Sequence, residues 1–451
     1  MLARQYIREN PEAVRIAVKN RNMGDGSIVD KFLEIDEKWR NIKVQCDDLR
    51  HKRNKISALV GEMKSKGGDG DIEAIIKESG EIKTKLEKLG GDAGMLENDL
   101  EKILLEFPNI PHESVPLGLD SSGNVEIRQV GFENMRRIPD KTIQHYDLGV
   151  ELNIIDEERG SKISGSGFYF LKGDGARLER ALISFMLDVH RDQGYTEIIP
   201  PILVSSASME GTGQFPKFIN DAYKIEGEDL WLCPTAEVPV TNMYSGEIFL
   251  LEDLPVKHQA YTPNFRREAG EHGTETRGIV RVHQFNKVEL VNFCHPEMSY
   301  SQLELLVEEA EEVLKQLELP YRVISLCTGD LTFSSAKTYD IEAWAPPSNG
   351  GGVKDGRWLE VSSASNFEDF QSRRAGIRYR PERHGSAEYI HTLNASGLAL
   401  PRVMVAILEY YQNEDGSVDI PSVLRPYMGG LEKIRGNEVL GENAIGSGLR
   451  T

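Results

Sequence analysis

The chain has 451 residues, 39% of them hydrophobic, and a formal net charge of −19, so we expect a globular protein of two or more domains whose acidic surface as a whole does not bind nucleic acid. It has no run of eighteen apolar residues and no apolar leader in its opening MLARQYIREN, which argues against a membrane span and a secretory signal. The four scattered cysteines (Cys46, Cys233, Cys294, Cys327) lack the spacing of zinc ligands or disulfides, so we expect a reduced, cytoplasmic protein without structural zinc.

Two long heptad series dominate the first quarter of the chain. Apolar residues recur in steps of four and three from 28 to 63, with Arg53 as the polar exception, and again from 72 to 107, with Ser79 as the exception. This pattern predicts two helices packed along an a/d seam. The glycine-rich KSKGGDGD (64–71) between them predicts a turn, so the helices must run antiparallel. We expect this hairpin to flex, because the second helix contains glycines that weaken it, namely Gly80, Gly90, Gly91 and Gly94.

Beyond a proline-rich linker (109–118), short β-rich runs alternate with helices. Amphipathic helices are expected over 175–194 and 299–319, and a strand that runs into a helix over 396–412. Strands are expected over 195–204, 222–226, 256–267, 284–293, 321–327, 338–344 and 357–363. Hairpin connections favour an antiparallel sheet with helices to one side, which is an α+β fold. The chain has no P-loop and no G-x-G-x-x-G motif, so any nucleotide site must be of another kind.

The stretch NFRREAGEHGTETRGIVRVHQFNKVEL (264–290) reads as two strands joined by a polar loop. Alternation would place Arg266 and Glu268 on one face of the first strand, and Phe285, Lys287 and Glu289 on one face of the second. An arginine fork suits a phosphate, a carboxylate accepts from the adenine amine, and an aromatic ring stacks on a base. The stretch therefore predicts an ATP site, although a solvent-exposed charged hairpin has the same pattern.

Three further segments contain residues that could bind ATP, magnesium or an amino acid, but each alone also fits an ordinary structural role. RWLEVSSASNF (357–367) places Glu360 beside serines, which suits magnesium in the presence of phosphates but also an ordinary strand end. NASGLALPR (394–402) places Arg402 at a helix start, where an anion is favoured, although such an arginine is often incidental. LCPTAEVPV (232–240) is a proline-flanked loop with Thr235 and Glu237, and alone it is a weak signal.

Together and in order, these segments resemble the class II aminoacyl-tRNA synthetases, and specifically the seryl-tRNA synthetase family. GYTEIIPPILV resembles the first class motif, NFRRE and VHQFNKVE the second, and GLALPR the third, while PTAEVPVTN, EVSSASNFEDFQSRR and HTLNASGLALPR resemble seryl-enzyme signatures. The resemblance spans essentially the whole chain. It implies an N-terminal tRNA-binding domain (1–108) whose coiled-coil arm covers about 27–107, the linker, and a catalytic, dimer-forming domain (119–451).

The resemblance also implies a role for each matching residue. Arg266 would hold the α-phosphate, Arg402 the γ-phosphate, and Glu360 would act beside them. ATP would contact Arg266, Arg267, Glu268, Val282, Phe285, Glu360, Val361, Ser362, Ser363 and Arg402, with Mg²⁺ at Glu360 and Ser363. L-Serine would contact Thr235, Ala236, Glu237, Glu289 and Ser396. No enzymic nucleophile is required, so His258, His272 and His283 are read as structural, and Lys287 has no assigned role.

The far end of the predicted arm is basic, in contrast to the acidic chain. Residues 49–66 contain Arg50, Lys52, Arg53, Lys55, Lys64 and Lys66 against Glu62 alone. Such a cluster fits a phosphate backbone, and the family resemblance implies tRNA(Ser) and also tRNA(Sec) as partners, with a homodimer. A packing or dimerisation coiled coil is the alternative for the arm. Two alternatives remain for the chain: a paralogue that loads a small amino acid onto a carrier protein, and an inactive coiled-coil scaffold.

Overall fold

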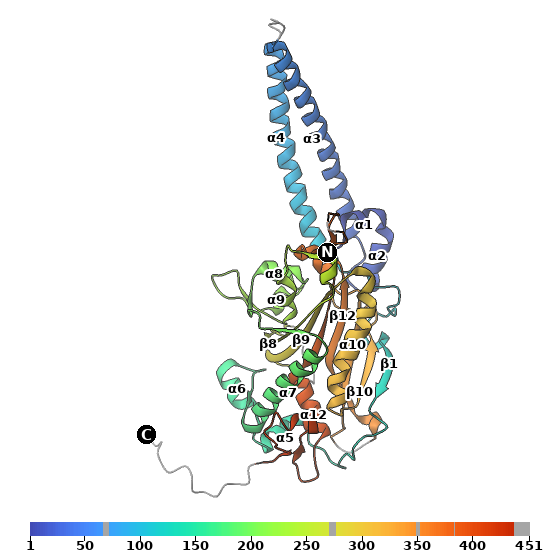
Figure 1. Cartoon of the computed structure of the whole chain (residues 1–451), viewed down its shortest axis with the longest axis vertical. Coiled ribbons are helices and arrows are strands. Elements are labelled where there is room, and N and C mark those ends of the chain that lie inside the picture. The colour runs from blue at the N-terminus through green and yellow to red at the C-terminus, as the bar shows by residue number, and fades with distance from the viewer. Residues whose placement is uncertain (66–71, 270–276, 349–351, 383, 437–451) are drawn as a thin grey trace, which may run out of the picture. The chain divides into compact units, whose positions relative to one another are not determined.

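The computed structural model describes residues 1–65, 72–269, 277–348, 352–382 and 384–436 of the chain (Figure 1). The backbone divides into two compact units, Met1–Pro108 and Asn109–Thr451. Within these described ranges, no helix is both long and apolar enough to cross a lipid bilayer.

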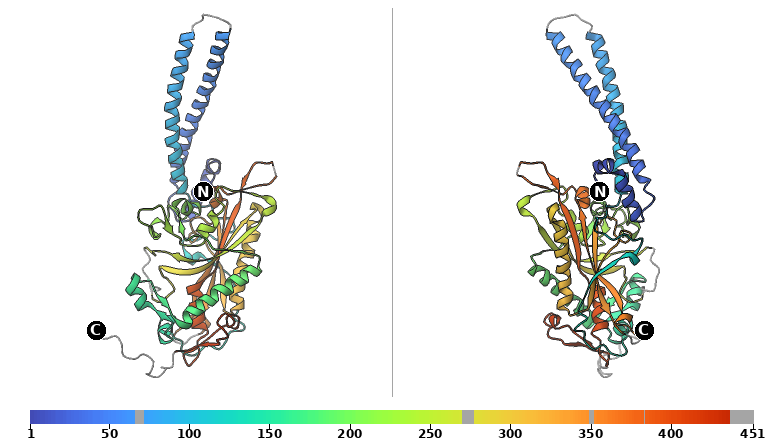
Figure 2. Two further views of the ribbon diagram at one scale, coloured as in Figure 1. Left: turned by 60° about the vertical axis from the view of Figure 1, so that its left-hand side comes forward. Right: turned by 90° about the vertical axis from the view of Figure 1, so that its right-hand side faces the viewer.

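The first unit is entirely helical. Two short helices, α1 (Arg4–Glu9) and α2 (Pro11–Asn20), precede two long ones, α3 (Ile28–Ser65) and α4 (Ile72–Leu105). The long helices lie side by side and antiparallel (Figures 1 and 2), which confirms the prediction from the heptad pattern. The turn expected over 64–71 lies largely outside the described residues.

The heptad positions of α3 and α4 are the shielded ones. Phe32, Cys46, Ile82 and Leu100 are buried, whereas Arg53, the polar exception in the first series, is exposed. Burial of apolar side chains along one stripe of each helix stabilises the pair, because it removes these side chains from water. The helix α4 is continuous through its four glycines, and a Cβ added to any of them would meet no other atom.

The second unit is built on an eight-stranded sheet in the order β1-β10-β11-β12-β15-β9-β8-β4. In that order the strands are Val125–Val130, Tyr321–Ser325, Lys337–Ala345, Arg357–Glu368, His391–Ala399, Gln284–Cys294, Val256–Phe265 and Thr196–Ile198. All neighbours pair antiparallel except β4 and β8, which pair parallel at one edge. The antiparallel α+β fold expected from the sequence is therefore confirmed.

Three helices pack on one face of this sheet: α7 (Gly173–Asp192), α10 (Ser299–Gln316) and α12 (Leu400–Tyr410) (Figure 1). The main core lies between them and includes Leu182, Leu306, Val405, Leu290 and Ile341. Burial of the apolar residues on this side leaves the opposite face of the central strands free to carry polar side chains.

Shorter elements surround the sheet. The remaining helices are α5 (His145–Glu151), α6 (Glu157–Ser164), α8 (Ser206–Gly211), α9 (Glu237–Asn242) and α11 (Phe370–Ala375). Small sheets pair β2 (Ile155–Asp156) with β3 (Phe170–Leu171), β5 (Leu203–Val204) with β6 (Trp231–Leu232), β13 (Arg378–Arg380) with β7 (Ile248–Leu250) and β14 (Glu388–Tyr389), and β16 (Val418–Asp419) with β17 (Lys433–Ile434).

Two strand predictions were wrong. Residues 222–226 form no strand, and only Lys224 makes an isolated bridge, to Trp231. The expected strand over 195–204 is two short strands, β4 and β5, because Pro200 and Pro201 between them have no N–H to donate to a ladder.

The linker segment 109–118 lacks regular structure, yet Asn109 donates to the carbonyl oxygens of Ser334 and Phe367, at 2.9 and 2.8 Å.

Candidate active site

A row of polar side chains crosses the face of the sheet opposite the helices. Glu289 on β9 pairs in register with Ser396 on β15, and Lys287 pairs with Thr262 on β8. Ser365 on β12 pairs with Asn394 on β15. Because partners in an antiparallel ladder share a face, the register brings polar groups from four strands together.

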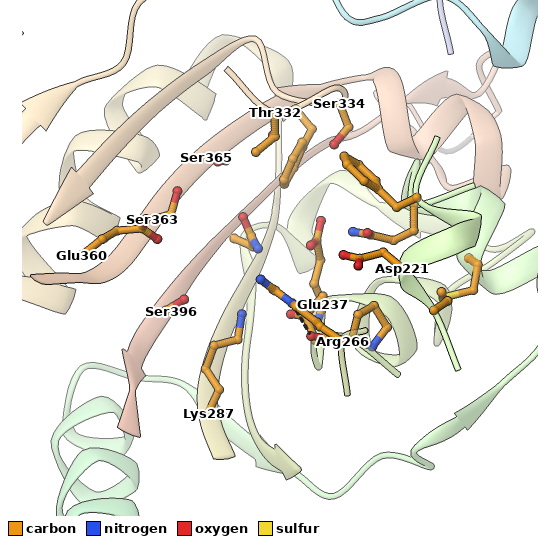
Figure 3. Close-up of a pocket in the computed structure, with 18 residues that line it drawn as sticks. Asp221, Glu237, Arg266, Lys287, Thr332, Ser334, Glu360, Ser363, Ser365 and Ser396 are labelled. Atoms are coloured by element: carbon orange, nitrogen blue, oxygen red, sulfur yellow. Dashed lines mark hydrogen bonds between the residues drawn. The ribbon is translucent and has the colours of Figure 1, made fainter. Parts of the chain in front are cut away.

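Two cavities open on this face, of about 340 and about 290 Å³. The first is lined by residues that include Thr235, Glu237, Thr332, Ser334, Ser363, Ser365 and Asn394 (Figure 3). The second is lined by residues that include Glu268, Val280, Arg281, Val282, Phe285, Pro401 and Arg402. Five described residues line both cavities, and they are Asp221, Arg266, Lys287, Glu360 and Ser396.

Arg266 lies where the two cavities meet. Its guanidinium is 5.3 Å from the centre of the Phe285 ring, and its Nε donates to the carbonyl oxygen of Pro234 at 3.4 Å. The expectation that Arg266 and Glu268 lie on one strand was wrong, because β8 ends at Phe265 and Glu268 has a left-handed backbone with φ +48°. Glu268 nevertheless faces the second cavity, where its Oε2 lies 3.1 Å from Nη1 of Arg281.

The two residues that flank Glu268 are held by Asp221 from another part of the chain. The Asp221 carbonyl oxygen accepts from the Arg267 backbone, and the Asp221 Oδ1 accepts from the backbone N–H of Ala269, both at 2.9 Å. Arg267 itself lines neither cavity. Residues 270–276 of the polar loop between Arg266 and Phe285, with His272, lie outside the described residues.

A β-bulge brings Glu360 and Ser363 to one cavity although they are three residues apart. On β12, Ser362 pairs with Ile341 and Glu360 with Glu342, so Val361 is the extra residue. Val361 packs in the core, and the buried Ser362 hydroxyl donates to the carbonyl oxygen of Ser396 at 2.6 Å. Neither of these two side chains lines a cavity.

Arg402 lies in the first turn of the helix α12 and lines the second cavity. Its Nη1 donates to the carbonyl oxygen of Glu360 at 2.8 Å and lies 3.3 Å from the Glu360 carboxylate, and its Nε donates to the carbonyl oxygen of Val280 at 3.4 Å. These contacts tie the third motif to the strand that carries Glu360 and to the segment before β9. They fix the position of the guanidinium, which also faces the second cavity.

The loop at 233–237 lines the first cavity with Thr235 and the buried Glu237. The Thr235 hydroxyl accepts from the Glu237 backbone at 3.2 Å, while the Ala236 side chain packs in a separate core cluster. Burial and the nearby Glu289 raise the pKa of Glu237 to about 7, although Gln371 donates to its Oε1 at 2.6 Å. A carboxyl group in such a position changes charge near neutral pH and binds a cation strongly once it is ionised.

Glu289 lies behind the first cavity and is fully buried. Its Oε1 accepts from Nδ2 of Asn394 at 2.7 Å, and its Oε2 forms an ion pair with Lys287. Sequence reasoning assigned no role to Lys287, Asn394 or Asp221. The alternation of 285, 287 and 289 does place Lys287 on the site face, whereas nothing local marks Asp221 or Asn394.

The two described histidines near the site have structural partners. Nε2 of His258 lies 2.7 Å from the Tyr244 hydroxyl, and burial lowers its pKa. Nδ1 of His283 lies 2.9 Å from the carbonyl oxygen of Arg266, and its ring stacks on Phe168. These contacts fit the expectation that His258 and His283 are structural residues.

The donors near Glu360 fit a magnesium ion that takes further ligands from phosphates and water. A carboxylate and the Ser363 hydroxyl face one cavity, and the buried Asp340 pairs with Ser363 across the strands with its Oδ1 unpartnered within the described structure. All are oxygen donors, which magnesium prefers. The described residues contain no group of three or more His, Cys, Asp or Glu side chains placed to hold a metal by themselves.

The four described cations of the predicted basic cluster lie on the surface of α3. Arg50, Lys52, Arg53 and Lys55 are all exposed, and Arg50 forms an ion pair with Asp47 at 2.8 Å. Lys66 and the side chain of Lys64 lie outside the described residues. The four described cations form a solvated patch that is available to a polyanion.

Comparison with known proteins assigns both parts of the chain. Residues 1–111 match the model of the seryl-tRNA synthetase N-terminal domain, and residues 221–411 match that of the class II tRNA synthetase core domain (G, H, P, S and T). Serine–tRNA ligases from Haloarcula marismortui and Halorubrum lacusprofundi are 59% and 60% identical, over 99% of this chain and at least 99% of theirs. The crystal structure of Pyrococcus horikoshii seryl-tRNA synthetase complexed with ATP has a TM-score of 0.89 at 39% identity, covering 97% of this chain and all of that one.

Proposed function

The chain belongs to the seryl-tRNA synthetase family, and on this premise we propose how its residues divide the work of the reaction. The enzyme activates L-serine with ATP to seryl-adenylate and transfers the seryl group to the 3′ end of tRNA(Ser). One observation supports the division of roles: two adjoining cavities share Arg266, and the first is lined by Thr235, Glu237 and Asn394, whereas the second is lined by Glu268, Phe285 and Arg402.

The first cavity takes L-serine. The Glu237 carboxylate pairs with the ammonium group of the substrate. Glu289 accepts a hydrogen bond from the substrate hydroxyl, Ser396 accepts from it or donates to it, and Thr235 lies beside them. The buried Glu289 supports this assignment, because its carboxylate loses a partner when the ligand has no hydroxyl. A site built to bond a hydroxyl discriminates strongly against alanine, whereas discrimination against threonine rests on excluding one methyl group.

The second cavity takes ATP. Phe285 stacks on the adenine ring, Glu268 accepts from its amine, and Arg402 binds the γ-phosphate, with Val282 against the base. Magnesium bound at Glu360 and Ser363 would neutralise phosphate charge. The serine carboxylate attacks the α-phosphate in line, Arg266 donates to the non-bridging oxygens, and pyrophosphate leaves. Positioning and preorganised charge account for such catalysis, so no protein nucleophile is required.

The first unit binds the tRNA. The exposed cluster of Arg50, Lys52, Arg53 and Lys55 supports this role, because cations on an otherwise acidic protein attract a phosphate backbone, and double-stranded RNA is recognised largely through its shape and phosphates. Lys64 and Lys66 extend the same cluster in sequence. We assign tRNA(Ser) to this surface and extend the proposal to tRNA(Sec), which the family resemblance implies.

The second unit forms a homodimer, and the reaction takes place in the cytoplasm. Ile199, after the edge strand β4, is 90% exposed, and Leu203 is 43% exposed. Apolar side chains at a sheet edge favour coverage by another chain. The four cysteines are free thiols in the structure, which is the state that a reducing compartment maintains.

Serine-dependent exchange of pyrophosphate into ATP tests the activation step. We expect exchange with L-serine and far less with alanine, glycine or threonine, followed by charging of tRNA(Ser). Exchange without tRNA charging would favour the carrier-loading paralogue. Absence of exchange with every amino acid would favour the inactive scaffold and would overturn the proposal.

A further inference from the structure

Lys287 occupies a position where a strand of an ordinary sheet has an apolar residue. It lies on β9, between β8 and β15, and it is only 6% exposed. Burial of an ammonium group is costly unless the charge is paired. The assigned roles at this site leave Lys287 unused, so its charge requires a separate explanation.

The partner of Lys287 in the structure is the Glu289 carboxylate, two residues along the same strand. Glu289 is itself fully buried, and its other oxygen accepts from Nδ2 of Asn394 at 2.7 Å. An ion pair alone would account for a lysine that is sealed in the core. Lys287 is not sealed, however, because its side chain lines both cavities.

The position of Lys287 coincides with that of the reacting atoms. Among the described residues that line both cavities, Arg266 and Lys287 are the two cations. Their side chains extend toward one another into the same space (Figure 3). If serine occupies one cavity and ATP the other, the carboxylate and the α-phosphate meet at this shared boundary, where two anions must approach closely.

We propose that Lys287 is a second catalytic cation, which turns its ammonium from Glu289 onto the serine carboxylate and the α-phosphate as adenylate forms. This inference rests on the proposed function of the two cavities. A carboxylate oxygen forms a bond to the α-phosphorus while the bond from that phosphorus to pyrophosphate breaks, and the electron pair leaves with pyrophosphate. Lys287 donates hydrogen bonds and transfers no proton.

The division of labour between the two cations follows from their shapes. The planar guanidinium of Arg266 presents paired donors that match two oxygens of one phosphate, whereas an ammonium is a compact charge on a flexible stem. A flexible cation can leave Glu289 and follow the oxygens as their charge grows. The binding of serine would at the same moment offer the hydroxyl of the substrate to the Glu289 carboxylate.

A simpler role is that Lys287 only keeps Glu289 charged and in place. The two roles make different predictions for kinetics. A residue that holds Glu289 affects the binding of serine and therefore its KM, whereas a cation that acts on the transition state affects kcat. The two roles also differ once Glu289 is uncharged. If Lys287 only pairs with the Glu289 carboxylate, its loss should have no effect in the E289Q background.

The test is a double-mutant cycle of K287M and E289Q, read by serine-dependent pyrophosphate exchange. We expect K287M to lower kcat about 100-fold, in the range measured when one transition-state donor is removed, and to change the serine KM by less than about threefold. We expect a similar loss of kcat when K287M is added to E289Q. The double variant leaves no unpaired buried charge at either of the two substituted positions, so it keeps the experiment informative if K287M alone does not fold.

The matched control is K257M. Lys257 is a partly buried lysine on β8 that pairs with the buried Glu309, and it lines neither cavity. We expect K257M to leave kcat within about twofold of wild type. A rise in the serine KM with unchanged kcat, or no effect of K287M in the E289Q background, would overturn the inference. Absence of exchange in the wild-type protein would instead overturn the proposed function on which it rests.

Discussion

Replacement of Glu237 by glutamine should stabilise the fold and weaken serine binding at the same time. Glu237 is buried in the first cavity, beside Arg266, Lys287 and Glu289, and the desolvation of its carboxylate raises its pKa from 4.5 to about 7. Glutamine has nearly the same shape, and its oxygen can still accept the hydrogen bond from Gln371. The variant therefore removes mainly the charge.

The size of the stability effect follows from linkage. A carboxyl group whose pKa is higher in the folded than in the unfolded state binds more protons when folded, so the free energy of unfolding falls as pH rises from about 4.5 to about 7. At about 1.4 kcal/mol per pKa unit, the ionised carboxylate costs about 3 kcal/mol above pH 7 and nothing below about pH 4.5. E237Q should therefore be about 3 kcal/mol more stable than wild type at pH 8, and nearly equal to it at pH 4.5.

Two measurements check this reasoning. Urea unfolding at pH 4.5 and pH 8 gives the difference in stability, with the fold monitored by circular dichroism. For wild type, the serine KM in pyrophosphate exchange should fall about tenfold between pH 6 and pH 8, because only the ionised carboxylate pairs with the serine ammonium. E237Q should raise this KM at least about 100-fold and make it independent of pH between 6 and 8. Equal stability of the two proteins at both pH values, or a flat serine KM in wild type, would refute the assignment of a buried carboxyl that titrates near pH 7.

Three further predictions concern regions outside the pocket. Deletion of residues 27–107, or reversal of charge at Arg50, Lys52, Arg53 and Lys55, should leave pyrophosphate exchange within about twofold of wild type and abolish tRNA charging; equal loss of both activities would contradict separate roles for the two units. I199D should convert the proposed dimer to monomer in size-exclusion chromatography with light scattering, because a charge cannot be covered at an apolar interface; an unchanged mass would remove this edge as the interface. Gly90→Ala combined with Gly94→Ala should stabilise the arm by about 1 kcal/mol per site, because each added Cβ meets no atom and alanine favours the helix; lower helicity or a lower thermal midpoint would show that the glycines serve packing or bending.

Periodicity in the sequence was sufficient for the features that depend on near neighbours. The arm follows from two heptad series, since each helix has one apolar stripe and the glycine-rich stretch leaves only an antiparallel arrangement. The position of Phe285, Lys287 and Glu289 on one face follows from alternation along a strand. The strand β9, predicted over 284–293, and the passage from a strand end into a helix over 396–412 were also predictable from local pattern, whereas the first part of β15 was not predicted.

The tertiary structure decided what these residues meet. Alternation could not predict that Glu268 enters the site from a left-handed turn, because its neighbours bond to the distant Asp221. Nor could it predict that a bulge at Val361 turns Glu360 and Ser363 to the same cavity, because the bulge depends on pairing with another strand. The same holds for the pKa of Glu237 and for the Lys287–Glu289 ion pair at the meeting of two cavities, since charge burial results from elements far apart in the chain. The sequence alone thus determined which residue types stand on each strand and helix, whereas only the folded chain determined their electrostatic surroundings, because the distances between charges are set by long-range packing.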